Sequence, residues 1–355
     1  MSRQLAASTS QLSIPKFGDA STIASLFSLS SSWTAPMPSQ SSLSALTVPT
    51  NVQDSTTAWL MENWNVSSSS LSNTQFVQDP FGSAQVEGDE EELVLSVNYP
   101  KGTREGSQFF STPMRADSNV QTAVLQYEVA FDDGFSFVKG GKLPGLYGSE
   151  KGAESICSGG NRQSSCFSAR LMWRSKGEGE VYAYIPTYDG FCRQFDVDCN
   201  DVYGISLSRG SFDFSAGGWT TITQLISLNT PPFANGLLYL WANNTLALAH
   251  TGLVWRTNED VTLSKIMFST FFGGSDSSWD SEGGNSYFRN FQVYAGQSPS
   301  NTTGPPVNAT LSTTSSASSP PSSSKFALRR QHWSGIELAS CSHRILLALH
   351  PFNIS

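Results

Sequence analysis

Two short segments near the middle of the chain carry polar side chains at alternating positions. Ser168 and Arg170 lie two residues apart in the first segment, and Tyr182 and Tyr184 lie two residues apart in the second. Alternate residues of a β-strand share a face, and a loop with two glycines at residues 175–179 predicts a hairpin between the segments. The hairpin would gather a hydroxyl, a guanidinium and two phenols on one face, which a hydrophobic core rarely does.

These residue types suit the abstraction of a proton next to a carboxylate. A guanidinium such as that of Arg170 binds a carboxylate through two hydrogen bonds and keeps its charge. A phenol or an amine can take a proton when neighbouring cations or partial burial lower its pKa. Tyr182, Tyr184 and Lys142 are the candidates for that step, and the residue types leave open which of them removes the proton.

Lys142 lies in a glycine-rich segment, residues 140–145. Glycines at positions 140, 141 and 145 leave the backbone bare, so that a large ligand could approach it closely with Lys142 above it. The alternative is a surface loop with solvated lysines. The recurrence of Lys, Ser, Arg and Tyr within one short region favours a site.

The sequence resembles polysaccharide lyase family 14, which includes alginate lyases and related glucuronan-cleaving enzymes. The resemblance covers about Ala58 to Gly296 and rests on three motifs: Gly140-Gly141-Lys142-Leu143-Pro144-Gly145, Ser168-x-Arg170 and Tyr182-x-Tyr184. Flanking segments also match: Asp79-Pro80-Phe81, Tyr99-Pro100-Lys101-Gly102, Gly218-Trp219, Asn229-Thr230 and Phe271-Phe272-Gly273-Gly274.

The resemblance implies a fungal-type secreted lyase that cleaves a 4-linked polyuronate by β-elimination and leaves an unsaturated uronate end. It implies Lys142 and Ser168 as catalytic residues, with Tyr182 and Tyr184 completing the catalytic set and Arg170 binding substrate. No metal and no cofactor are expected.

Two further cations are candidates for substrate binding. Arg174 continues the same strand face as Arg170, although exposure at an edge would explain it equally well. Lys139 is either the outer wall of a substrate groove or a solvated lysine.

Alternating apolar residues predict an all-β protein. The clearest strand runs from Thr122 to Phe131, and Asn235-Gly236 and Asn243-Asn244 are hairpin signals. Further strands are predicted near residues 204–207, 220–228, 237–241, 245–250, 264–272 and 287–294. Short strands without long amphipathic helices between them predict a jelly-roll β-sandwich, and the resemblance implies the same fold with a concave substrate groove.

Composition divides the chain into four parts. Residues 1–56 are a Ser/Thr-rich leader without a sustained pattern, and residues 57–297 form the lyase-like domain. Residues 298–325 are a Ser/Thr/Pro-rich linker, and residues 326–355 are a tail without a usable period. The leader and the tail are predicted to be disordered.

The net charge of −8 argues against nucleic-acid binding, because no basic footprint is available for phosphates. Lys139 to Arg193, in contrast, carries eight basic and five acidic residues, which suits an acidic polysaccharide. No apolar stretch approaches the length of a membrane span. Separately, the protein is expected to be a monomer.

Cysteines and glycosylation signals predict an extracellular protein, although the signal peptide is poorly visible. Spacing favours two local disulfides, Cys157 with Cys166 and Cys192 with Cys199, over a zinc site. Asn-x-Ser/Thr signals begin at Asn65, Asn243, Asn301, Asn308 and Asn353, and the first four are the predicted glycosylation sites. Disulfides and glycosylation are typical of secreted proteins.

Two other functions are compatible with a jelly roll. A noncatalytic carbohydrate-binding protein would use the same fold. A glycoside hydrolase would need Glu87, Asp89 and Glu92 on one strand face, whereas Gly88 and the unbroken acidic run favour a solvated turn. His250 is interpreted as a structural strand histidine.

Overall fold

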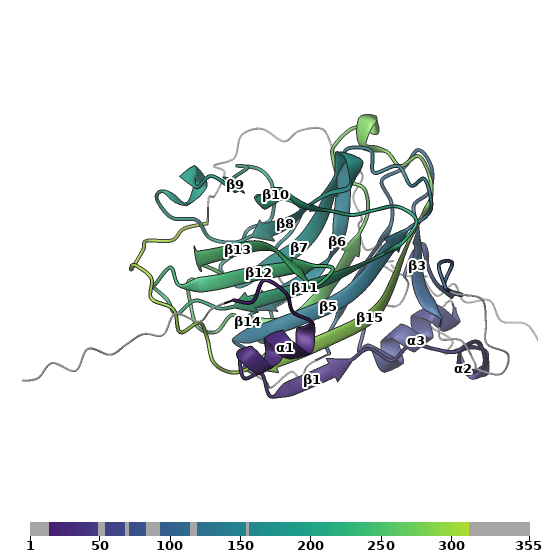
Figure 1. Ribbon diagram of the computed structural model, residues 1–355, viewed down its shortest axis with the longest axis horizontal. Helices are drawn as coiled ribbons and strands as arrows, with labels where there is room; N and C mark the ends of the chain where they lie inside the picture. Colours follow the sequence, from purple (N-terminus) through teal and green to yellow (C-terminus); the bar gives the residue numbers. More distant parts are fainter. Residues whose placement is uncertain are drawn as a thin grey trace, which may run out of the picture. The chain divides into compact units, whose positions relative to one another are not determined.

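The computed structural model describes residues 14–48, 54–67, 71–82, 93–113, 119–153 and 156–311. Two antiparallel sheets pack face to face and enclose one hydrophobic core (Figure 1). The prediction of an all-β jelly-roll sandwich is confirmed.

The larger sheet has eight strands, one of which, β1, pairs only with β15. Its remaining strands follow the order β13-β12-β11-β5-β15-β3-β2. The strands are β1 (Ser31–Thr34), β2 (Thr74–Val77), β3 (Val94–Asn98), β5 (Thr122–Phe131), β11 (Trp219–Ser227), β12 (Gly236–Ala242), β13 (Thr245–Leu253) and β15 (Asn285–Gly296).

The smaller sheet has seven strands in the order β4-β14-β6-β7-β8-β10-β9. Its strands are β4 (Ser107–Ser111), β6 (Gly140–Ser149), β7 (Cys166–Arg174), β8 (Glu178–Tyr184), β9 (Val197–Asp198), β10 (Ile205–Asp213) and β14 (Thr262–Thr270). One face of this sheet covers the core, and we call the opposite one its outer face.

Short helices complete the described fold. The α-helices are α1 (Ala20–Leu26), α2 (Gln40–Ala45) and α3 (Ser55–Asn63), and the 3₁₀ turns are η1 (Ser175–Gly177), η2 (Phe191–Arg193) and η3 (Ser277–Trp279). Among the residues that the structure describes, no helix has the length and apolar character that crossing a bilayer requires.

The segment predicted as a disordered leader instead carries regular structure in its described parts, residues 14–48 and 54–56. α1 places Ile23 against the outer side of the larger sheet, in one cluster with Val124 and Trp241, and β1 pairs with β15. The Ser/Thr-rich composition concealed the apolar residues of α1, and the burial of Ala20, Ile23 and Ala24 favours an ordered segment.

The predicted linker also differs from expectation over residues 298–311. Thr187 and Thr310 exchange backbone hydrogen bonds of 2.8 Å in both directions, and Ala234 N–H donates to the Pro305 carbonyl. Backbone pairing therefore fixes this stretch to the sandwich. The rest of the linker, the tail and Cys341 lie outside the described residues.

One hairpin signal is confirmed and one is wrong. Asn243 and Asn244 join β12 to β13 with positive φ angles of 48° and 61°, as a type I′ turn requires. Asn235-Gly236, in contrast, begins β12 after the loop of residues 228–235. Asn235 accepts a hydrogen bond from Thr230 N–H and stabilises that loop.

Candidate active site

The predicted hairpin is confirmed as β7 and β8, joined by η1. Arg170 lies opposite Tyr182 and Ser168 opposite Tyr184 in the register of the two strands. On its other side β7 pairs with β6, where Lys142 lies opposite Met172. Three neighbouring strands of one sheet therefore bring the predicted catalytic set together.

The glycines of the Lys142 segment do not serve the purpose that the sequence suggested. Residues 140–149 form a buried central strand. A β-carbon on Gly145 would lie 2.1 Å from the Ala169 carbonyl oxygen, and one on Gly141 would lie 2.0 Å from the Trp173 indole. These glycines let β6 pack closely against β7, and close packing rather than access for a ligand accounts for them.

Lys142 projects from β6 over its neighbours on the outer face. Its side chain is only 9% exposed, its Nζ lies 3.1 Å from Met172 Sδ as a donor, and it lies 4.5 Å from the centre of the Tyr182 ring. Burial, followed by the charges of Arg170 and Arg174, lowers the pKa of Lys142 well below its usual value, against a smaller opposing effect of Glu180. The amine is therefore suited to accept a proton.

Arg170 is a buried cation. It is 1% exposed, its Nη1 donates to Ser269 Oγ at 2.9 Å, and its Nε has no hydrogen-bond partner. No carboxylate of the described residues forms an ion pair with it. Burial lowers the pKa of Arg170 to about 10, so the guanidinium stays charged at neutral pH. A buried charge without a counterion is costly, and a carboxylate of a ligand would supply one.

The two phenols are fixed by backbone N–H groups. Tyr182 Oη accepts from Gly204 N–H at 3.0 Å, and Tyr184 Oη accepts from Gly160 N–H at 3.1 Å. Burial, helped by the neighbouring Tyr184, raises the pKa of Tyr182 above its usual value. The Tyr182 hydroxyl therefore keeps its proton and can donate it.

Ser168 holds a loop in this structure. Its fully buried hydroxyl donates to the Cys157 carbonyl at 2.6 Å. Cys157 forms a disulfide with Cys166, and the same loop supplies the N–H that binds Tyr184. The hydroxyl thus orients the loop that borders the site, and a catalytic role for Ser168 stays a prediction.

Arg174 and Lys139 have partners within the protein. Arg174 donates to Glu180 Oε1 from Nε at 2.9 Å and from Nη2 at 2.5 Å, and its charge is thereby neutralised. Lys139 is exposed, donates to Ser278 Oγ at 2.5 Å and lies 5.8 Å from the Trp279 ring. Arg170 differs from Arg174 because it has no described partner carboxylate, and it differs from Lys139 because it is buried.

Sequence reasoning assigned no role to several polar residues that support this arrangement. Glu180 is fully buried and accepts from Arg174, Ser206 and Arg209. Its place on the same strand face as Tyr182 was the available signal. The sequence also did not predict the role of Ser269, because its contact with Arg170 depends on a strand pairing that the sequence does not reveal.

The predicted disulfides are confirmed. Cys157 bonds to Cys166 with an S–S distance of 2.04 Å, and Cys192 bonds to Cys199. Within the described part of the chain, no three His, Cys, Asp or Glu residues gather as a metal site would require.

His250 lies on β13 and is 4% exposed. Its Nε2 lies 2.9 Å from Ser208 Oγ and 3.3 Å from Asp196 Oδ2. Burial lowers the pKa of His250. These contacts join the edges of the two sheets, and they fit the predicted structural role.

The structure describes the predicted glycosylation sites but not the acids of the alternative hydrolase function. The predicted glycosylation sites Asn65, Asn243, Asn301 and Asn308 are exposed, and the signal at Asn353 lies outside the described residues. The acids of the rival hydrolase reading, Glu87, Asp89 and Glu92, lie outside the described residues.

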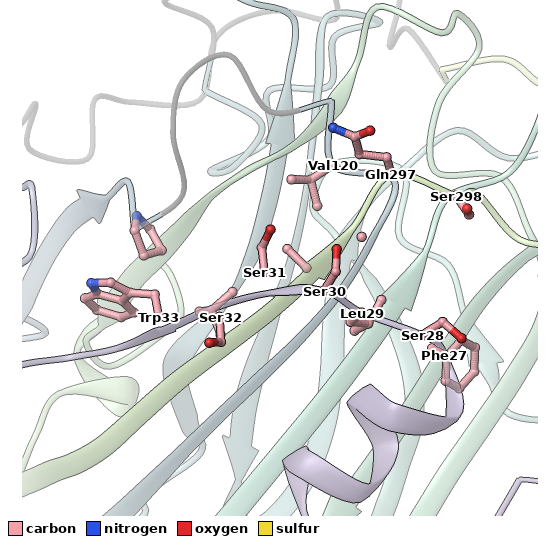
Figure 2. Close-up of a pocket in the computed structure, with 14 residues that line it drawn as sticks. Phe27, Ser28, Leu29, Ser30, Ser31, Ser32, Trp33, Val120, Gln297 and Ser298 are labelled. Carbon is pink, nitrogen blue, oxygen red and sulfur yellow. The ribbon is translucent and has the colours of Figure 1, made fainter.

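A pocket of about 590 Å³ lies elsewhere, beside β1 and the end of β15. Figure 2 shows Ser30, Ser31 and Ser32 along its wall, between Phe27 and Trp33. None of its lining residues is charged and none belongs to the candidate catalytic set. An acidic polymer would find no counterion there, so the pocket does not compete with the outer face of the smaller sheet.

Comparisons with known proteins bear on the family and the fold. The polysaccharide lyase 14 family profile matches residues 87–291. The crystal structure of the marine PL-14 alginate lyase from Aplysia kurodai is 32% identical, with a TM-score of 0.59, over 76% of this chain and 99% of that one.

Two viral proteins are more distant relatives. Alginate lyase vAL-1 from a Chlorella virus is 22% identical, with a TM-score of 0.51 over 66% of this chain and 93% of that one, and supports the fold. Exolysin of Paramecium bursaria Chlorella virus 1 is 25% identical over 216 residues, which is 54% of this chain. The match spans about a third of Exolysin, 32% of its length.

Proposed function

The chain belongs to the polysaccharide lyase 14 family, and we propose that it cleaves a 4-linked polyuronate, such as alginate or glucuronan, by β-elimination. The observation that carries the proposal is the position of Arg170, a buried cation without a described partner carboxylate, on the strand next to Lys142. The lyase from Aplysia kurodai, similar over nearly its whole length, is an alginate lyase, which makes alginate the first substrate to test.

The chemistry requires a base, an acid and a counterion for the substrate carboxylate. Arg170 would bind the uronate carboxylate and stabilise the negative charge that develops as the C5 proton leaves. Lys142 would take that proton, since its lowered pKa favours the neutral amine. The C4–O4 bond then breaks as a double bond forms between C4 and C5.

Tyr182 would supply the proton that the leaving 4-oxygen needs. Its raised pKa keeps the phenol protonated, and its oxygen already accepts the Gly204 N–H, which leaves the hydroxyl proton free to be donated. We assign Tyr184 and Ser168 to the support of the neighbouring disulfide loop, because each binds that loop's backbone. Tyr184 remains the second candidate for proton transfer.

We further propose that the protein is secreted, glycosylated and monomeric. The two disulfides and the exposed glycosylation signals support the first two proposals. A fungal-type origin and a substrate groove on the outer face of the smaller sheet stay predictions.

The decisive experiment is incubation of the purified chain with alginate, glucuronan and pectate. New absorbance in the low ultraviolet, from the double bond conjugated to the carboxylate, would establish β-elimination. New reducing ends without that absorbance would indicate a hydrolase. Binding without cleavage would indicate a carbohydrate-binding protein. The whole chain should be used, because residues 14–48 pack on the sandwich.

A further inference from the structure

Lys142 faces the site only because its strand contains an irregularity. In a regular strand, residues an odd number of positions apart point to opposite faces. Leu143 and Leu146 are three residues apart, yet both pack in the core. Lys142 and Tyr147 are five residues apart, yet Lys142 contacts Met172 and Tyr147 belongs to the cluster on that same outer face.

The irregularity is a β-bulge at Pro144. Leu143 lies opposite Leu171 and Gly145 lies opposite Arg170, so β6 has one residue more than β7 in this interval. A bulge re-aims the side chains that precede it and interrupts the ladder of backbone hydrogen bonds. Without it, the alternation set by Leu146 and Tyr147 would turn Lys142 toward the core.

Two side chains from the opposite sheet bind the backbone at the bulge. Gln224 on β11 accepts from Leu146 N–H through Oε1 at 3.0 Å and donates from Nε2 to the Ala169 carbonyl at 2.9 Å. Tyr127 on β5 donates its hydroxyl to the Pro144 carbonyl at 3.0 Å. Both side chains are fully buried.

We infer that Gln224 and Tyr127 are positioning residues for the reaction, acting through the bulge on Lys142 and Arg170. Buried backbone groups must find partners, and here the partners of Leu146, Ala169 and Pro144 come from the facing sheet. The amide of Gln224 is suited to the Leu146 N–H and the Ala169 carbonyl because it carries an acceptor and a donor together.

The inference rests on the proposed lyase function, and one pair of variants tests it. Gln224→Met keeps the length of the side chain and removes both hydrogen bonds. Gln126→Met is the matched control: Gln126 accepts from Ala20 N–H and Thr223 Oγ1, both at 3.1 Å, and bonds neither β6 nor β7.

We expect Gln224→Met to lower kcat by about 100-fold, the scale of an error of roughly 1 Å in catalytic geometry, with KM changed little. The pH at which activity rises should also move, because Lys142 would no longer lie at its native position against Arg170. Gln126→Met should alter neither quantity. Native kcat and an unchanged pH profile in Gln224→Met would overturn the inference.

Two further measurements keep the test decisive. If Gln224→Met fails to fold, Tyr127→Phe removes only the contact with Pro144, and an unchanged kcat there would overturn the inference. If the native protein cleaves no uronan, the proposed function fails on its own. Amide hydrogen exchange at Leu146 then decides: faster exchange in Gln224→Met than in Gln126→Met is expected, and equal exchange would show that Gln224 does not hold the bulge.

Discussion

Replacing Arg170 with methionine should make the protein more stable and nearly inactive. The guanidinium is buried with one side-chain partner, Ser269, and with an unbonded Nε. Methionine fills much of the same volume without charge, and Ser269 keeps its bond of 3.1 Å to Gln108. Since the free enzyme carries the desolvation cost of this cation, its removal should raise the free energy of unfolding by about 1–3 kcal/mol.

Activity should change in the opposite direction. Loss of one preorganised contact to developing charge costs about 10²- to 10³-fold in kcat. The change in stability is read from thermal unfolding, where 1 kcal/mol shifts Tm by about 2–4 °C in a domain of this size class. Activity is read from the ultraviolet absorbance of the unsaturated product.

Arg256→Met is the matched control, because Arg256 is also buried but has many partners. It donates to Gln121 and to the carbonyls of Asn229, Glu259 and Val261. Its replacement leaves those acceptors unpaired and should lower Tm. If Arg170→Met lowers Tm to the same extent, Arg170 is not an uncompensated cation. If Arg170→Met retains native kcat, then the native Arg170 does not neutralise the substrate carboxylate.

The remaining predictions concern the base and the acid. Because Lys142 must be neutral to act as the base, kcat/KM should rise as pH increases through its lowered pKa. Lys142→Ala should abolish turnover, whereas Lys139→Ala should raise KM alone. Between the lowered pKa of Lys142 and its value in the unfolded chain, the folded state binds fewer protons than the unfolded state. The free energy of unfolding should therefore rise with pH in that window. A Lys142→Met variant that keeps this slope would contradict the lowered pKa of Lys142. Tyr182→Phe should lower kcat at every pH if the phenol is the acid, whereas Tyr184→Phe should retain a larger share of kcat; the reverse order would exchange their roles.

Alternation and spacing were sufficient to predict the hairpin and both disulfides. The positions of Ser168, Arg170, Tyr182 and Tyr184 follow from period two within neighbouring strands, which is local information. The cysteine pairs close short loops, so their spacing carried enough information as well. These features need no knowledge of how distant strands meet.

The orientation of Lys142 could not be predicted in the same way. It depends on the bulge at Pro144 and on Gln224, which is 82 positions away from Lys142 in the chain by difference of residue numbers. The role of the glycines was misread for a related reason: the atoms that exclude a β-carbon belong to β7, and only the sheet order reveals that contact.

The N-terminal segment was misjudged because composition averages over residues that act individually. Ser and Thr make up 13 of the 35 residues from 14 to 48 (10 Ser and 3 Thr), yet Ile23 is completely buried against the larger sheet. Asp19 caps α1 by accepting from Thr22 N–H, a signal that a search for start sites of helices could have found.

The position of β15 in the larger sheet bears on how the chain folds. β15 is the last strand in sequence, yet it lies between β5 and β3 and also pairs with β1. During synthesis, β3 and β2 therefore cannot join the other strands of that sheet through β15 until residue 296 has left the ribosome. Strand edges left open for that time favour association with other chains, and such non-local pairing folds slowly. Folding after release of the complete chain therefore suits this topology better than folding during synthesis.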